Sequence, residues 1–282
     1  MKTFKTYTDI PADSQDAVVA MGNFDGVHLG HQSVIALARA IAATNNAPLG
    51  VITFEPHPRQ LFAPDAPPFR LMNEKTRAHR INKLGIDALF ELPFNTALSQ
   101  LTAEEFARDV LANGLKIKHV IIGADFRFGK GRQGDADMLC EFGQEMGFGV
   151  TLAPLISDDK GDYSSSAIRE ALNNGHPEDA ARILGHWHRI DGIVEKGDQR
   201  GRELGFPTAN ISLDDLHLPK FGVYAVFFDI LDGPHKGVYR GAASLGIRPT
   251  FGINKPSLET FLFDFSGDIY DASVSVALVA YQ

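Results

Sequence analysis

The stretch MGNFDGVHLGHQ, residues 21–32, joins an apolar run to a segment rich in Ala and Leu and decides the fold of the first half of the chain. The preceding VVAM (18–21) is typical of a buried strand, and residues 33–43 are typical of a helix. The pattern predicts a strand-to-helix turn with His28 and His31 where the helix begins. Ligands of parallel sheets bind at such turns, beyond the carboxyl ends of the strands.

The same turn has the features of an anion-binding site. Gly22 and Gly26 permit positive φ and close approach of the backbone. His28 and His31 are three apart, so on a helix they share one face. The helix N-terminus adds N–H donors and partial positive charge, which suit a phosphate. Two other interpretations stay open: a helix cap with two surface histidines, and a metal site, although no Cys or acidic partner is grouped with the pair.

Composition indicates a globular chain with room for two domains, because it has 282 residues, 44% hydrophobic and 22% charged. The formal net charge of -8 argues against a nucleic-acid-binding protein. The single Cys140 excludes an internal disulfide framework and favours a reducing compartment. Residues 1–16 lack a signal-peptide core, and no run approaches a membrane span. We therefore expect a cytoplasmic protein with no nucleic-acid or membrane partner.

Strands and helices alternate up to residue 184. Thr102 and Glu105 form a predicted capping box for one helix, which we expect to end at Asn113-Gly114. The alternation predicts an α/β, Rossmann-like domain over residues 1–184, in which helices cover both faces of a parallel sheet. Its predicted strands are the short apolar segments 17–22, 49–54, 87–91, 118–123 and 149–154.

Residues 185–282 follow a different pattern. The strand-like segments are FGVYAVFFDIL (221–231), PSLETFLFDF (256–265) and DASVSVALVAYQ (271–282), separated by turns of Gly, Pro, Asn and Asp. This arrangement predicts a second domain over residues 185–282, a small antiparallel β-barrel or sandwich.

Four motifs in order carry a family resemblance: GNFDGVHLGH (22–31), TFEPHP (53–58), GADFRFGKGRQGD (123–135) and SSSAIREAL (164–172). Residues 15–184 thereby resemble the N-terminal FMN adenylyltransferase module of the bacterial bifunctional riboflavin kinase/FAD synthetase family, with its H-x-G-H signature. The resemblance implies that His28, His31 and Arg169 are catalytic. It also implies an ATP site made of Gly22, Asn23, Phe24, Asp25, Ser165 and Ser166.

The chemistry of adenylyl transfer agrees with these residue types. The FMN phosphate attacks the α-phosphorus of ATP and is already an anion, so positioning and charge stabilisation are required rather than a base. Arg169 would hold the β- and γ-phosphates as a donor fork, although SSSAIRE alone also fits a helix start with a solvated Arg. The resemblance implies that the flavin binds Phe62, Phe106, Asp125 and Phe128; for Phe106, a plain core role is the alternative.

The second half contains GDQRGRELGFPTANI (197–211), which resembles the PTAN motif of riboflavin kinases, and it has no Walker-type G-x-x-x-x-G-K-[ST] loop. The hydroxyl of Thr208 and the side-chain carbonyl of Asn210 are hard oxygen ligands suited to Mg²⁺. The resemblance implies that both residues bind the metal and ATP, and that Lys196, Gly197 and Gly205 cover the ATP phosphates. Taken alone, PTAN also fits a turn with a capping Asn.

GAASLGIRPTFG (241–252) and LETFLFDF (258–265) continue the kinase resemblance in order. Phosphorylation of a riboflavin hydroxyl benefits from a base, and the family's catalytic Glu corresponds to Glu259. A solvent-facing Glu on an edge strand is the alternative. The family's kinase domain continues into a long terminal helix, whereas this chain stops at Tyr281-Gln282. We therefore expect a truncated barrel whose exposed apolar surface favours self-association into a homo-oligomer.

The resulting prediction is a bifunctional enzyme that acts on small molecules. It would phosphorylate riboflavin to FMN with Mg²⁺-ATP, and adenylylate FMN to FAD with release of pyrophosphate. Two alternatives remain: an FMN adenylyltransferase with an inactive kinase-like half, and a flavin-binding regulator. The intact His28, His31, Arg169 and Glu259 argue against the regulator.

Overall fold

The structure is a computed structural model, and it describes residues 1–196, 207–213, 215–247 and 256–282. By their internal contacts these residues form two compact units. The first comprises residues 1–66 and 77–162, and the second comprises residues 67–76 and 163–282.

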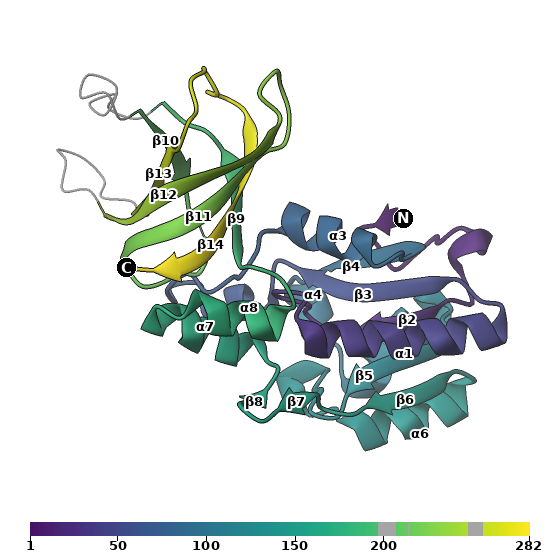
Figure 1. Cartoon of the computed structure of the whole chain (residues 1–282). Coiled ribbons are helices and arrows are strands. Elements are labelled where there is room, and N and C mark those ends of the chain that lie inside the picture. The colour runs from purple at the N-terminus through teal and green to yellow at the C-terminus, as the bar shows by residue number, and fades with distance from the viewer. Residues whose placement is uncertain (197–206, 214, 248–255) are drawn as a thin grey trace. The chain divides into compact units, whose positions relative to one another are not determined.

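The first unit is built on a six-stranded sheet in which every neighbouring pair is parallel (Figure 1). The strand order is β1-β4-β3-β2-β5-β6, so β3 and β5 flank β2 on opposite sides. The carboxyl end of β2 is therefore the topological switch point of the sheet. The strands are β1 (Lys2–Phe4), β2 (Val18–Met21), β3 (Leu49–Glu55), β4 (Ala88–Pro93), β5 (His119–Gly123) and β6 (Gly149–Ala153).

The five predicted strands of this half and its parallel sheet are confirmed. The edge strand β1 was not predicted, because three largely exposed residues carry no periodic signal. The remaining elements are η1 (Ala12–Ser14), α1 (Leu29–Asn45), α2 (Pro58–Phe62), α3 (Glu74–Lys83), α4 (Thr96–Ser99), α5 (Ala103–Glu105), the π-helix η2 (Phe106–Leu115), η3 (Lys130–Arg132), α6 (Ala136–Met146), β7 (Ser157–Asp158) and β8 (Gly161–Asp162).

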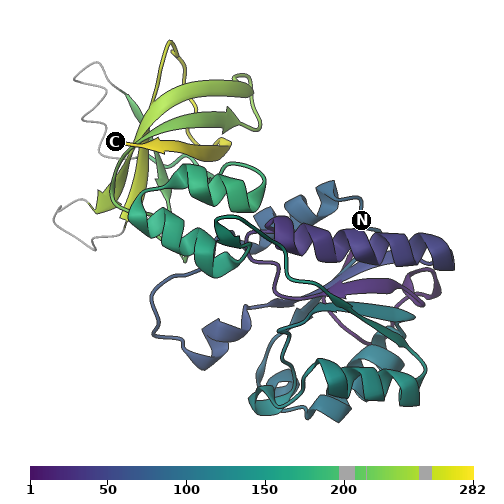
Figure 2. The same ribbon diagram turned by 60° about the horizontal axis from the view of Figure 1, so that its bottom comes forward.

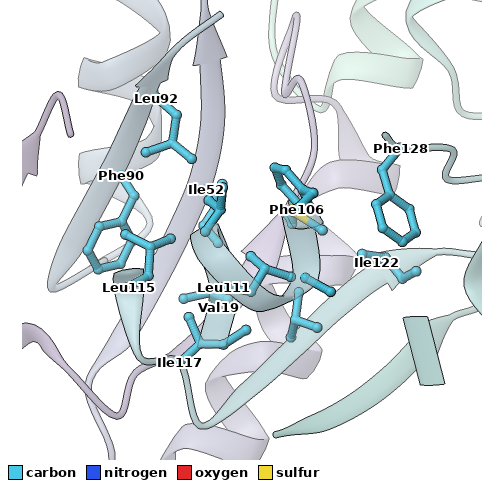
Figure 3. Packing of buried hydrophobic residues seen from close by; sticks show 14 of the residues in the cluster. Val19, Ile52, Phe90, Leu92, Phe106, Leu111, Leu115, Ile117, Ile122 and Phe128 are labelled. Atoms are coloured by element: carbon cyan, nitrogen blue, oxygen red, sulfur yellow. The ribbon is translucent and has the colours of Figure 1, made fainter. Parts of the chain in front are cut away.

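Helices cover both faces of this sheet. Figure 2 shows α1 on one side and the helices between residues 96 and 146 on the other. Figure 3 shows the second side from close by, where Val19, Ile52 and Phe90 of three strands pack against Leu111 and Leu115 of η2. All five side chains are fully buried, and each contributes roughly 1.5–3 kcal/mol by leaving water. Burial on both faces explains why these strands read as continuous apolar runs.

The predicted capping box is present, since the Thr102 hydroxyl accepts the Glu105 N–H at 3.1 Å and the Glu105 carboxylate accepts the Thr102 N–H at 2.8 Å. The predicted end at Asn113-Gly114 is wrong by two residues, because η2 continues to Leu115. Gly114 lies inside the helix instead of ending it. A Cβ there would come within 2.6 Å of the Tyr7 carbonyl oxygen, so close packing is what excludes a side chain.

The second unit holds α7 (Ser165–Asn174), α8 (Pro177–Leu184) and a six-stranded antiparallel sheet of order β10-β13-β12-β11-β14-β9 (Figure 1). The Glu195 N–H donates to the Asn210 carbonyl at 2.8 Å, and this bridge nearly closes the sheet into the predicted barrel. The strands are β9 (Arg189–Ile193), β10 (Thr208–Ser212), β11 (Gly222–Ile230), β12 (Gly237–Ile247), β13 (Pro256–Leu262) and β14 (Ser273–Tyr281).

No helix among the described residues is both long and apolar enough to cross a membrane.

Two buried histidines make the second unit sensitive to acid. Burial, reinforced by the positive charges of neighbouring basic groups, lowers the pKa of His188 to about 3 and that of His217 to about 4. The ordinary value of about 6.5 applies when the chain unfolds. Between these values the unfolded chain binds more protons than the folded one, so acidification favours unfolding.

We therefore predict that the contribution of these two histidines to the free energy of unfolding is constant well above pH 6.5 and falls below it. For His188 the slope is up to about 1.4 kcal/mol per pH unit. His188→Leu should flatten the decline between pH 6.5 and 4, measured by thermal melts of the full chain followed through the fluorescence of Trp187, the only tryptophan. The exposed His176→Gln is the control and should leave the slope unchanged. An unaltered slope in His188→Leu would contradict the assignment.

Candidate active site

The two histidines of the first turn form one compact unit at the start of α1. His28 is the N-cap, and its Nδ1 accepts the backbone N–H of His31 at 3.3 Å. The two rings stack with centroids 3.6 Å apart. Because Nδ1 of His28 accepts, the proton of a neutral His28 lies on Nε2. His28 is therefore both the helix cap and one member of the histidine pair. The two sequence-based interpretations do not exclude each other.

His31 is held in its neutral form. Burial, and to a smaller extent the neighbouring His28, keeps the pKa of His31 well below its usual value. Its Nδ1 is buried and has no hydrogen-bond partner among the described residues. The ring also packs on Phe24, with centroids 5.1 Å apart. A positive charge on His31 is thus disfavoured until an anion arrives to compensate it.

The backbone of the turn is unusual at three positions. Gly26 has φ +90°, as expected, but Phe24 and Val27 also lie in the left-handed region, with φ 52° and 45°. The expectation of positive φ at Gly22 is wrong. Gly22 precedes the residues of the turn with positive φ. A Cβ at Gly22 would meet only the Phe24 ring, at an ordinary distance of 3.5 Å. Asn23 is exposed, whereas Phe24 and Asp25 are buried.

The predicted flavin residues belong to a row of aromatic rings at the carboxyl ends of β3, β4 and β5. Phe106 and Phe128 are buried in the core with centroids 5.8 Å apart (Figure 3). Phe62 is 65% exposed and packs edge-on against Phe94 at 5.8 Å. Asp125 is exposed in the turn after β5. The sequence prediction missed the rings that connect these groups, Phe54, Phe94 and Phe126.

Ser165, Ser166 and Arg169 lie on the first turns of α7, as predicted, with Ser164 as N-cap. This helix belongs to the second unit, where Arg169 is anchored by the segment 67–76. Its Nε donates to the Phe69 carbonyl at 2.7 Å, and its guanidinium lies 5.5 Å from the centre of the Phe69 ring. The side chain is therefore a held cation at a helix start, which excludes a freely solvated Arg.

The predicted kinase residues converge on one face of the barrel. Register pairs Asn210 of β10 directly with Glu259 of β13, and Glu259 with Ser244 of β12. Thr208 is two residues from Asn210 and therefore on the same face. The Asn210 amide donates to the Thr208 carbonyl at 3.3 Å, which ties the two together. Glu259 lies on the inner strand β13, so the alternative of an edge-strand Glu is wrong.

A cavity of about 540 Å³ is lined by Ala209, Thr260 and Leu262, which lie on the opposite face of these strands from Asn210 and Glu259. Thr208, Thr260 and Tyr270 are among the residues that line it. Thr260 is 0% exposed, and its hydroxyl has no hydrogen-bond partner among the described residues. The ammonium of Lys196 lies 5.8 Å from the centre of the Tyr270 ring. Gly197 and Gly205 lie outside the described residues.

The sequence prediction did not include Thr260 or Tyr270. The available signal was the strand alternation around Glu259, which sends Thr260 to the opposite, inner face. Across the described part of the chain, no three His, Cys, Asp or Glu side chains are grouped as a metal site.

Family models divide the chain in two. Residues 10–167 match the model of the FAD synthetase family, and residues 184–282 match that of the riboflavin kinase family. These two matches favour an enzyme with two activities over a regulator or a single transferase.

Relatives match over nearly the whole chain. A protein named bifunctional riboflavin kinase/FMN adenylyltransferase from Pseudomonas fluorescens is 39% identical, over 98% of this chain and 88% of that protein. The protein of the same name from Escherichia coli K12 is 37% identical, over 95% of this chain and 84% of that protein. The protein of the same name from Bacillus subtilis is 36% identical, also over 95% and 84%.

A solved structure adds a likeness in three dimensions. A crystal structure described as a macrolide-efflux protein from Streptococcus pneumoniae superposes with a TM-score of 0.86 and 32% identity, over 99% of this chain and 90% of that one. That protein has the same two-part fold as this chain, although its description differs from the name that the sequence relatives share. On the family models and relatives together, the chain belongs to the family of bifunctional riboflavin kinases/FMN adenylyltransferases.

Proposed function

We propose that residues 1–184 transfer AMP from ATP to FMN around the His28–His31 pair, and that residues 185–282 phosphorylate riboflavin around Asn210 and Glu259. The chain is an enzyme of both FMN and FAD synthesis. The observation that carries the assignment of the first site is the stacked histidine pair at the N-terminus of α1, beyond the carboxyl end of β2 at the switch point.

In the first reaction, a phosphate oxygen of FMN attacks the α-phosphorus of ATP and pyrophosphate leaves. The nucleophile needs no deprotonation, so the site has to align the two anions and stabilise the charge that develops. His28 presents Nε2–H, and the α1 N-terminus adds its partial positive charge. His31, neutral before ATP binds, becomes easier to protonate as negative charge approaches.

The wall of this ATP site is formed by Gly22, Asn23, Phe24 and Asp25. The Phe24 ring packs against the ring of His31. Ser165, Ser166 and Arg169 bind the β- and γ-phosphates that depart as pyrophosphate. The flavin ring stacks beside the exposed Phe62, with Asp125 placing its polar edge. Phe106 and Phe128 shape that site from below, since both rings are buried in the core.

In the second reaction, Glu259 accepts the proton of the riboflavin hydroxyl as the hydroxyl oxygen bonds to the γ-phosphorus of ATP. The bond from that phosphorus to the β–γ bridging oxygen breaks, and ADP leaves. Glu259 lies directly across from Asn210, so base and phosphate ligands share one face. Thr208 and Asn210 would hold Mg²⁺ through their oxygens, and the metal would neutralise charge on the phosphates. Lys196, Gly197 and Gly205 cover the ATP phosphates.

Further properties follow from composition. The chain has one cysteine, so we place the reactions in a reducing compartment, the cytoplasm. The net charge of -8 supports small-molecule substrates over nucleic acid as partners. Exposed barrel side chains such as Val238, Phe263 and Ile247 support a homo-oligomer.

Two reciprocal variants separate the two sites. His31→Gln should lower kcat for FMN adenylylation about a hundred- to a thousandfold and leave riboflavin phosphorylation intact, because one site loses its charge stabilisation. Glu259→Gln should lower riboflavin phosphorylation by about a hundredfold or more and leave FMN adenylylation intact. Chromatography of FMN and FAD from parallel reactions started with riboflavin or FMN measures both. Loss of both activities in either variant would contradict the division of labour.

Substitution of Thr260, whose hydroxyl has no hydrogen-bond partner among the described residues, should have opposite effects on stability and on substrate binding. Thr260→Val removes this buried hydroxyl, so the free energy of unfolding should rise by about 1 kcal/mol. If a substrate satisfies that hydroxyl, KM for ATP or for riboflavin in the kinase reaction should rise about tenfold. Denaturant melts and kinase kinetics measure the pair. An unchanged KM for both substrates would mean that the cavity's ligand does not reach Thr260.

A further inference from the structure

A buried charged cluster lies beside the turn that carries the histidine pair, and neither reaction described above uses it. Arg77 of α3 has a side chain only 1% exposed. Its Nη2 lies 2.8 Å from Oε2 of Glu55 at the end of β3 and 2.7 Å from Oε1 of Glu91 in β4. The Glu91 side chain is 2% exposed, and the ammonium of Lys5 lies 3.9 Å from its other oxygen.

Stability alone does not account for such a cluster. Taking ions out of water costs more than their attraction returns unless their geometry is nearly ideal, and well-packed apolar side chains often stabilise a fold equally well. The guanidinium here spans two carboxylates from neighbouring strands and still has donors for the backbone. An arginine is needed for such a fork, because an ammonium is a single point of charge.

Nη1 of Arg77 connects the cluster to the histidine turn. Its Nη1 lies 3.2 Å from the Phe54 carbonyl oxygen and 3.4 Å from that of Asn23. The hydroxyl of the fully buried Thr53 donates to the same Asn23 oxygen at 3.1 Å. One carbonyl oxygen of the turn is thus held by two side chains from outside it.

That carbonyl is at the point where the turn needs support. Asn23 directly precedes the reversed segment, in which Phe24 and Val27 have positive φ without being glycine. Such conformations carry a cost and persist only when surrounding contacts fix them. The other end of the segment is fixed by the His28 cap, so the Asn23 carbonyl provides the upstream anchor.

We propose that Arg77 is a positioning residue for AMP transfer. Clamped by Glu55 and Glu91, its guanidinium acts with Thr53 to hold the Asn23 carbonyl and thereby fixes the turn that presents His28 and His31. Arg77 touches no reacting atom in this role. The proposal rests on the function proposed above for the histidine pair.

The test uses the full chain with Arg77→Lys, Thr53→Val and the double variant. Lysine keeps the charge beside Glu91 but cannot form the fork, and valine removes only the hydroxyl. The double variant should lower kcat for FMN adenylylation about tenfold or more, because small misplacements of catalytic groups have effects of that size. KM for ATP and FMN should change by less than about threefold, and riboflavin phosphorylation in the same chain should be unchanged.

The control is Arg39→Lys, an exposed arginine on α1 that donates to the Leu84 carbonyl. It should leave both reactions unchanged. A wild-type adenylylation kcat in the double variant overturns the proposal, as does an equal fall of both activities. If the double variant does not fold, Thr53→Val decides by the same criteria. Full adenylylation in His31→Gln would instead show that the proposed function of the pair has failed.

Discussion

The cap that His28 forms on α1 is the contact on which the first active site depends. A capping Ser or Asp would satisfy the same helix N–H, but an imidazole also places a flat ring against that of His31. The cap therefore fixes the separation of the two imidazole rings through the backbone of the helix. Burial of His31 then lowers its pKa and favours the neutral form of its ring.

In the barrel, the register of the sheet positions the candidate residues. Antiparallel register sets Asn210, Glu259 and Ser244 side by side on three strands, so the proposed base and the proposed phosphate ligand are placed by the sheet itself. Alternation sends Thr260, the next residue, to the inner face and into the cavity. One strand thus supplies a candidate base to one surface and a candidate ligand contact to the other.

Local signals explain what the sequence could predict. The spacing of His28 and His31 placed both at one helix start, and the short apolar runs identified five strands of the parallel sheet. The failures have non-local causes. Gly114 looked like a helix stop, yet it is required by the nearby Tyr7 carbonyl. β10 and β12 were missed as strands because they are interrupted by polar residues and glycines.

The contacts of Arg77 show most clearly what sequence patterns cannot predict. In the sequence it is one of several basic residues on a short helix, with nothing to distinguish it from Arg80. Its role depends on Glu55, Glu91 and Asn23, which the sheet brings together from three separate segments. Partners so distant in sequence leave no periodic or spacing signal. Thr260 escaped prediction for a different reason, since a buried unpartnered hydroxyl can be recognised only in the folded barrel.

The central claim is that one chain adds two different phosphates of ATP to riboflavin in turn. The most direct test supplies riboflavin, Mg²⁺ and ATP labelled with ³²P at either the α- or the γ-position, and locates the label in the flavins after separation. Two active sites predict γ-label in FMN and both labels in FAD. Absence of γ-label from every flavin, with α-label entering FAD only when FMN is supplied, would contradict the account.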